Sequence, residues 1–327
     1  MHDHVDVLIV GAGISGLMAA RRLQQMGKRV LVLDKGAGVG GRMATRRIGP
    51  GRVDHGAQFF TVRTAEFQQH VDQWLADGLI FVWSQGWSDG SLAVTETDGY
   101  PRYAAHEGMT AVPKYLAQSL DVRTNVKLTS VKPHNDGWQA VDQNGEAYTS
   151  AALILTPPVP QSLALLAAGE TPLHPDDHTA LTQIAYAPCL CGLFWVQGKV
   201  HLPEPGALQR PFSPISWIAD NRRKGISPDA TLITVQGGPL FSQEHYEEEE
   251  TAVLAKLHAA LKPHLGEVAV VVEAQYKRWR YALPVALYPQ RCLRAQNVPP
   301  LVFAGDAFKE PRVEGAVLSG LAAAEAL

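Results

Sequence analysis

The spacing of apolar residues at the start of the chain predicts a strand, a helix and a second strand. Residues 5–10 are apolar except for Asp6, and an amphipathic segment that reaches Met26 leads to a second apolar run over 30–33. Short apolar runs on either side of a segment with helical periodicity are typical of a β-α-β unit whose strands are parallel and buried. We therefore expect such a unit over residues 5–34.

Three glycines lie at the turn between the first strand and the helix. In the order Gly11, Gly13 and Gly16 they can form the tight turn, let a pyrophosphate approach the backbone, and let the helix pack on the strand. The positive N-terminal end of the helix would hold the phosphates. Asp34 ends the second strand at about the 20-residue distance expected of a carboxylate that binds a ribose. Together these features predict a dinucleotide site.

A second glycine cluster follows Asp34 and ends in an arginine. Residues 36–41 contain four glycines, and Arg42 comes next. Because a guanidinium group matches two phosphate oxygens in a fork, Arg42 on this loop suits a second contact to the same pyrophosphate. The alternative is a solvated glycine loop with no ligand.

The remaining pattern predicts further helices and strands. Thr64 and Thr110 are expected to cap helices. Ser242 is expected to cap a long helix that reaches about Lys262, and the four glutamates at 247–250 suit the N-terminal end of that helix. Alternation and turn residues predict short strands within 80–103 and a three-stranded antiparallel meander over 126–148. A buried strand over 153–155 and strands over 190–196, 232–235 and 268–276 are also expected.

Small and aromatic residues alternate after the second glycine cluster. Ala57, with the glycine before it, would permit close approach of a flat ring, and Phe59 and Phe60 could form its walls. The alternative is a strand end with one core aromatic residue. His55 is better explained as a structural histidine than as a catalytic one.

The end of the chain predicts a third element of the nucleotide site. An apolar strand runs into Gly305 and Asp306, and a helix of small residues starts near Gly315. Asp306 can accept hydroxyl groups of a ribityl chain, and the helix N-terminus can face a developing negative charge. The alternative is an ordinary closing strand and helix.

Composition narrows the class of protein. The 327 residues, 46% hydrophobic and 19% charged with a net charge of −3, fit a globular protein of about two domains without a nucleic-acid or membrane surface. Prolines interrupt the apolar run over 151–168, so no transmembrane span is expected, and the cytoplasm is the expected location. Cys189 and Cys191 are expected to be buried strand residues, and neither a disulfide nor a metal site is predicted.

These stretches together resemble the renalase-like branch of the flavin amine-oxidase superfamily. The resemblance is carried by residues 40–43, 54–59, 108–110, 128–131, 156–157, 217–222, 278–279 and 305–315. It implies an α/β protein with a glutathione-reductase-like FAD-binding Rossmann domain containing a β-meander, and a discontinuous α+β substrate domain. The expected FAD domain covers 1–60, 105–160 and 290–327, and the expected substrate domain covers 61–104 and 161–289.

The resemblance also implies the residues of the site. The cofactor-binding residues would be Gly11, Ala12, Gly13, Ile14, Ser15, Gly16, Asp34, Lys35, Gly41, Arg42, Met43, Ala57, Gln58, Phe59, Leu128, Gly305, Asp306, Glu314, Gly315 and Ala316. The candidates for the substrate pocket are Phe60, Trp217, Asn221, Arg222, Trp279 and Tyr281. No catalytic residue beyond the flavin is implied.

Two departures from the superfamily pattern concern the chemistry. Residues 188–195 lack the lysine that amine oxidases usually carry near the flavin, and Cys292 is in no motif for covalent attachment. Both favour a non-covalent FAD and a substrate other than an ordinary amine.

The reaction implied by the resemblance is the oxidation of misreduced NAD(P). The 2- and 6-dihydro isomers would transfer a hydride to flavin N5, and molecular oxygen would then take the electrons, giving NAD(P)+ and hydrogen peroxide. An amine oxidase or another FAD dehydrogenase or desaturase of the superfamily is the main alternative. An electron-transfer flavoprotein and a non-catalytic dinucleotide-binding module are further alternatives.

Overall fold

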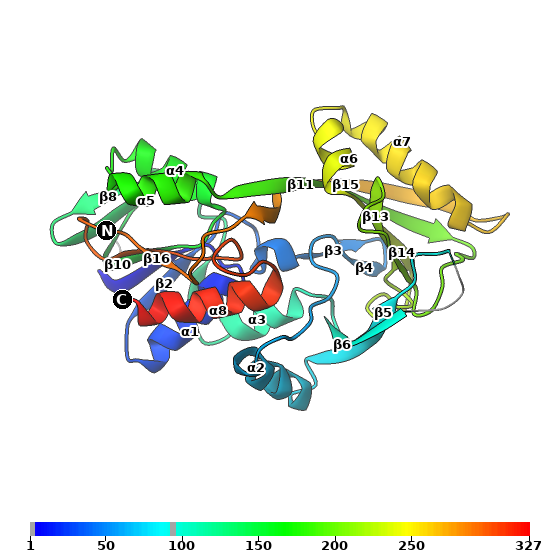
Figure 1. Ribbon diagram of the computed structural model, residues 1–327, viewed down its shortest axis with the longest axis horizontal. Helices are drawn as coiled ribbons and strands as arrows, with labels where there is room; N and C mark the ends of the chain where they lie inside the picture. Colours follow the sequence, from blue (N-terminus) through cyan, green and yellow to red (C-terminus); the bar gives the residue numbers. More distant parts are fainter. Residues whose placement is uncertain (1–3, 92–95) are drawn as a thin grey trace.

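The computed structural model describes residues 4–91 and 96–327, and Figure 1 shows them as two connected parts. The part that holds both ends of the chain is built on a large sheet. Its strands lie in the order β16 (Leu293–Arg294), β17 (Leu301–Phe303), β10 (Ala147–Leu155), β1 (Val5–Val10), β2 (Val30–Leu33) and β7 (Asp121–Arg123). The central strand β1 pairs in parallel with both β2 and β10, which confirms the expected β-α-β unit.

One strand of this sheet, β10, takes part in two kinds of pairing. Its first half pairs antiparallel with β9 (Gly137–Asp142), which in turn pairs with β8 (Leu128–His134), and its second half pairs in parallel with β1 and β17. The expected meander is confirmed. The strand expected separately over 153–155 is the end of β10, because alternating burial over 147–150 passes without a turn into residues buried on both faces.

Alternate residues of β1 face two different hydrophobic cores. Val7 and Ile9 pack toward α1 (Ile14–Gln25), α3 (Ala111–Ala117) and α8 (Arg312–Glu325). Leu8 and Val10 face the core that includes α4 (Val159–Ala168) and α5 (Pro175–Thr182). Helices thus cover both faces of the sheet. The boundary at residue 161 remains a prediction, but the side chains of α4 and α5 pack with the large sheet.

The apolar run over 151–168 divides between β10 and α4. No helix of the described chain combines the length and the hydropathy that a membrane crossing requires.

The second part is an antiparallel sheet. Its order is β12 (Ala207–Gln209), β13 (Ile215–Asp220), β14 (Thr231–Gly237), β11 (Ala185–Gln197) and β15 (Val270–Ala286). The strands expected over 190–196 and 232–235 are confirmed within β11 and β14, and the strand expected over 268–276 corresponds to β15, which begins at Val270 and runs on to Ala286. Figure 1 shows β11 and β15 running together from this sheet toward the first part.

Two hairpins and a helix lie between the two sheets. They are β3 (Thr45–Ile48) with β4 (Gly51–Asp54), β5 (Ile80–Trp87) with β6 (Glu96–Ala105), and α2 (Ala65–Ala76); η1 (Gly41–Met43) precedes β3. The strands expected within 80–103 are confirmed, and residues 92–95 of that range lie outside the described residues. Thr64 caps α2 through a bond from the Phe67 N–H to its Oγ1 (3.2 Å). Thr110 precedes α3, but its hydroxyl group makes no capping bond.

The long helix expected from Ser242 to about Lys262 is wrong. Residues 239–244 form α6 (Pro239–Glu244), the chain then turns, and α7 (Glu250–Leu261) leads into η2 (Lys262–His264). Ser242 lies inside α6, and its hydroxyl oxygen accepts a bond from the Leu190 N–H (3.1 Å). Consecutive glutamates repel one another within a helix and are favourable at its N-terminus, so the second helix begins at the glutamate run.

Candidate active site

A cavity of about 650 Å³ lies where the glycine turns of the first part meet the second sheet. From the first part it is lined by Gly13, Ile14, Ser15, Gly40, Arg42, Met43, Gly56, Ala57, Phe59, Phe60, Thr61, Arg63, Thr156, Gly305, Asp306, Arg312, Val313 and Ala316. From β6 and the second sheet it is lined by Asp98, Arg102, Pro188, Cys189, Gln209, Pro211, Ser216, Gln236, Gly237, Pro239, Trp279, Ala282 and Leu283. All three predicted glycine-containing elements therefore border one cavity.

The first glycine turn has the open backbone that a pyrophosphate needs. Gly11 has a φ of +101°, and a Cβ at Gly16 would lie 2.0 Å from the Gly11 carbonyl oxygen, so both positions require glycine. A Cβ at Gly13 would meet nothing within 4 Å. Beside it the Ser15 hydroxyl is buried without a hydrogen-bond partner in the described chain. A phosphate at the start of this helix would accept a hydrogen bond from that hydroxyl group, so these residues fit the pyrophosphate of the predicted dinucleotide.

Asp34 is held by the backbone of both glycine segments. Its Oδ2 accepts the Ala12 N–H at 2.7 Å, and its Oδ1 accepts the Gly36 N–H at 2.6 Å. These bonds fix the carboxylate at the carboxyl end of β2. Because a carboxylate offers about four lone-pair sites, Asp34 retains capacity for ribose hydroxyls.

Arg42 and Asp306, expected to contact different halves of a dinucleotide, lie against each other. The guanidinium group donates Nη1 to Oδ2 and Nη2 to Oδ1, both at 2.7 Å, and Nη1 also donates to the Tyr281 carbonyl at 3.2 Å. Burial raises the pKa of Asp306, and Arg42 opposes that shift. The pair therefore joins η1, the loop after β17 and strand β15 at the cavity wall.

A buried ion pair supports the segment that forms another wall. The Lys224 ammonium group contacts Asp54 Oδ2 and the Gln58 carbonyl oxygen, each at 2.5 Å, and lies 4.8 Å from the Trp83 ring centroid. Both charged side chains are fully buried. Burial lowers the pKa of Lys224, and Asp54 opposes that shift. The pair fixes the start and end of segment 54–58, which carries Ala57 into the cavity wall.

His55 is held as a neutral, stacked ring. It lies 5.4 Å from the Trp279 ring centroid at 15° between planes, and its carbonyl oxygen accepts the Trp279 indole N–H at 2.8 Å. Burial, with Arg46 and Lys277 nearby, lowers the pKa of His55 to about 3. This geometry supports the structural interpretation of His55, which also positions Trp279.

The structure brings some of the substrate candidates to the cavity. Phe60 and Trp279 line it, while Trp217 lies behind Phe59 at 5.5 Å between ring centroids. Tyr281 contributes its backbone carbonyl to Arg42.

Two other substrate candidates lie outside the lining. The Asn221 side chain is fully buried, with its Nδ2 donating to the Leu232 carbonyl and its Oδ1 accepting the Asp54 N–H. Arg222 is exposed on the turn after β13. The cavity lining does not include either residue.

Several residues that were expected to bind the cofactor form contacts within the protein itself. The Glu314 carboxylate accepts the backbone N–H groups of Arg63 (2.9 Å) and Thr64 (2.8 Å), so it anchors the start of α2. Gln58 donates Nε2 to the Asp54 and Gly56 carbonyls. Lys35 is exposed and donates a hydrogen bond to Gln161, and Leu128, the first residue of β8 in the meander, packs in the core.

Polar residues from both parts line the cavity and were missed from sequence. They are Arg63, Asp98, Arg102, Gln209, Ser216, Gln236 and Arg312. Most belong to no motif, and the seven come from six separate segments, so only the fold brings them together. Arg312 lies within a stretch quoted for the resemblance, but no spacing rule gave it a role.

Cys189 and Cys191 both lie in a strand, β11, as expected, but only Cys191 is fully buried. Cys189 is half-buried and lines the cavity. Burial raises the pKa of Cys189 to about 12 and raises that of Cys191 as well. Neither thiol is therefore a ready nucleophile. No group of three metal-ligating side chains occurs among the described residues.

Comparisons with known proteins agree with this architecture. The model of the NAD(P)-binding Rossmann-like domain matches residues 9–77, and the model of the flavin containing amine oxidoreductase family matches residues 76–327. Among solved structures, putrescine oxidase bound to putrescine is similar with a TM-score of 0.74 at 17% identity, over 99% of this chain and 98% of that one. A proposed protoporphyrinogen oxidase from Exiguobacterium sp. 255-15 is similar with a TM-score of 0.71 at 15% identity, over 99% and 98%.

These structural likenesses establish the fold, an α/β architecture with a Rossmann-like domain. The second family model covers more than half of the chain, including the cavity-lining residues from Asp98 to Ala316. The chain belongs to the flavin-containing amine oxidoreductase family and is a FAD-dependent oxidoreductase.

Proposed function

We propose that this enzyme is a renalase-like oxidase of dihydronicotinamide isomers, within a glutathione-reductase-like FAD domain plan. The observation that supports it most is the charge state of the cavity lining. Both carboxylates there, Asp98 and Asp306, are already paired with arginines. An amine cation would therefore find no free carboxylate among the described lining residues. No lysine occurs among them either.

The chain needs to position a flat ring and exclude water. Phe59, Phe60 and Trp279 provide aromatic walls, and Ala57 and the glycine before it leave space beside them. Bound FAD supplies the hydride acceptor at N5 and passes the electron pair to oxygen. The balanced reaction takes a dihydronicotinamide, a proton and oxygen to the nicotinamide cation and hydrogen peroxide. Because the substrate leaves as an aromatic cation, no protein group has to remove a proton from it.

The test is anaerobic rapid mixing of the yellow protein with candidate reductants. Borohydride-treated NAD, which contains the 2- and 6-dihydro isomers, should bleach the flavin within seconds, and ordinary NADH and putrescine should be much slower. Trp279→Ala should slow reduction by the isomers by roughly 10-fold or more through lost stacking. Trp279→Phe keeps a ring and serves as the matched control.

The competing function is amine oxidation, which the fold likeness to putrescine oxidase favours. Reduction by putrescine or another amine as fast as by the isomers would establish that alternative. If neither class bleaches the flavin, the proposal is wrong.

A further inference from the structure

The cavity lining carries more positive than negative charge. Its charged side chains among the described residues are four arginines and two aspartates. Arg42 pairs with Asp306, and Arg102 pairs with Asp98, where the Nη2–Oδ2 distance is 2.9 Å. The hydrogen bond from Arg102 lowers the pKa of Asp98, so that carboxylate stays ionised in its pair. Both negative charges of the lining are thus paired with arginines of the lining itself.

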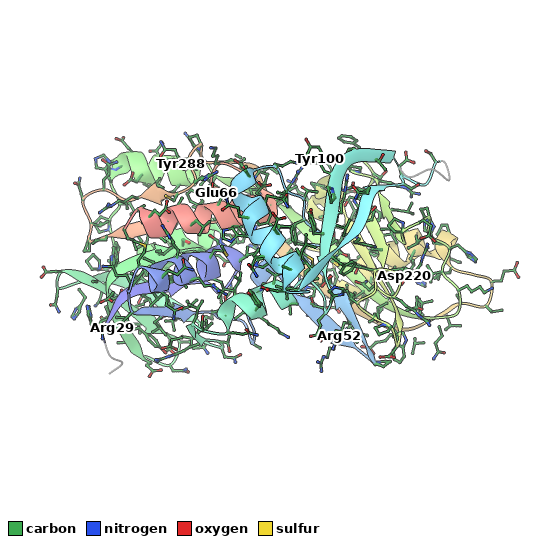
Figure 2. All side chains as sticks on the ribbon, turned by 90° about the horizontal axis from the view of Figure 1, so that it is seen from below. Arg29, Arg52, Glu66, Tyr100, Asp220 and Tyr288 are labelled. Carbon is green, nitrogen blue, oxygen red and sulfur yellow. The ribbon has the colours of Figure 1, made fainter. Side chains whose placement is uncertain are left out.

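Arg63 is held in place without an ion pair among the described residues, although it lies close enough to Asp98 to help lower the pKa of that carboxyl group. Its backbone N–H donates to Glu314 Oε2 at 2.9 Å, and its guanidinium carbon lies 3.4 Å from the Tyr100 ring centroid. Figure 2 shows Tyr100 on the arm formed by β6. Stacking on an aromatic face orients a guanidinium group and leaves the N–H groups at its edge available. Arg63 is therefore a preorganised donor at the cavity.

Arg312 stands beside the same anchor. It is the first residue of α8, two residues before Glu314, and its φ is +81°. A non-glycine residue in this region is strained, and such strain is concentrated at functional sites. Arg312 is exposed, lines the cavity, and has no ion-pair partner among the described residues. The positive end of a 14-residue helix adds to its field.

We propose that Arg63 and Arg312 form an anion subsite that binds a negatively charged oxygen group of the substrate. The subsite rests on the proposed function and makes it more specific, because the substrate must carry a phosphate or a carboxylate besides its hydride-donating ring. For a dihydronicotinamide dinucleotide, the group is a phosphate of the pyrophosphate bridge. Planar guanidinium groups match phosphate oxygens in pairs, and two of them give both affinity and orientation.

The first experiment measures binding and requires no turnover. Calorimetric titration of the FAD-loaded protein with sodium pyrophosphate, and separately with benzoate, compares wild type with Arg63→Gln and Arg312→Gln. Loss of a charge-assisted contact should weaken pyrophosphate binding by about 10- to 100-fold in each variant. Arg52→Gln is the matched control, because Arg52 is an arginine outside the lining and lies at the opposite edge from Tyr100 in Figure 2.

The second experiment shortens the substrate. Borohydride-reduced NAD, nicotinamide mononucleotide and nicotinamide riboside are compared as anaerobic reductants. In Arg63→Gln and Arg312→Gln, the half-saturating concentration should rise about 10-fold or more for the two phosphorylated donors and stay unchanged for the riboside. The FAD content of both variants should equal that of wild type.

The outcomes separate the two proposals. Arginine-dependent binding of pyrophosphate with no flavin reduction by any dihydronicotinamide would retain the subsite and refute the proposed function. Binding of benzoate alone would retain the subsite and identify a carboxylate substrate. Equal pyrophosphate binding in wild type and both variants would overturn the subsite. Loss of FAD from the variants would overturn it as well, because the arginines would then hold the cofactor.

Discussion

Removal of the buried Lys224 ammonium group should destabilise the protein strongly. In Lys224→Met the Asp54 carboxylate keeps the bonds from the Thr45 hydroxyl and the Met109 N–H, but it loses its only charged contact among the described residues. The Gln58 carbonyl oxygen loses its 2.5 Å donor as well. Breaking a fully buried ion pair by removing one partner costs about 3–5 kcal/mol in the free energy of unfolding.

A comparison of the single variant with a double variant separates the cost of the uncompensated Asp54 charge from the cost of the lost packing. Urea unfolding of the apoprotein, followed by tryptophan fluorescence, should show the full loss for Lys224→Met and a clearly smaller loss for Lys224→Met with Asp54→Asn. Lys256→Met is the control, because Lys256 pairs with Glu248 at the surface (3.0 Å), where such a pair is worth about 0–1 kcal/mol. FAD affinity should also fall, since segment 54–58 carries Ala57 to the cavity. A loss below about 1 kcal/mol, or equal losses in the single and double variants, would refute this reasoning.

Two further changes test the pH response and the cofactor contact. His55 has a folded pKa of about 3 and an unfolded pKa of about 6.5, so the unfolded chain binds more protons between these values, and stability falls as the pH drops below about 6.5. At pH 4.5 this costs about 2.7 kcal/mol relative to neutral pH, and unfolding curves of His55→Phe should lack that acid-dependent part; an identical acid slope would contradict it. Arg42→Ala should weaken FAD binding by roughly 10- to 100-fold and Arg42→Lys by less, measured by dialysis and acid release of the FAD, which we propose is non-covalent. Unchanged FAD retention in Arg42→Ala would place its guanidinium group outside the pyrophosphate contact.

The local features of the fold could be predicted because they leave a local pattern. The β-α-β unit, the Gly11 turn and the cap at Thr64 each depend on residues within a few positions of one another. The break between α6 and α7 was missed because four glutamates were interpreted as part of one helix. Only Glu250 lies in the second helix, with Glu249 at its N-cap, where negative charge is favourable.

The cavity could be predicted only in part. The glycine turns and Asp306 follow strand ends, where a sheet of this kind gathers its ligand contacts. Arg42 meets Asp306 across 264 residues, and Lys224 meets Asp54 across 170, so no spacing rule reaches either pair. The same holds for Arg63 and Arg312, which line the same cavity from segments 249 residues apart. Charge pairing inside a cavity is decided by tertiary contacts, and these determine which substrates the lining can accept.

The double pairing of β10 also has a consequence for synthesis of the chain. Its Leu153 lies beside Leu301, so the end of the strand that pairs with β17, residues 153–155, has no partner on that edge until 148 further residues have been made. At about 5–20 residues per second, that interval is roughly 7–30 s on the ribosome. During it, an apolar strand edge would be open to pairing with other chains. Slow translation or truncation before β17 should therefore favour aggregation of nascent chains, even where the finished protein is stable.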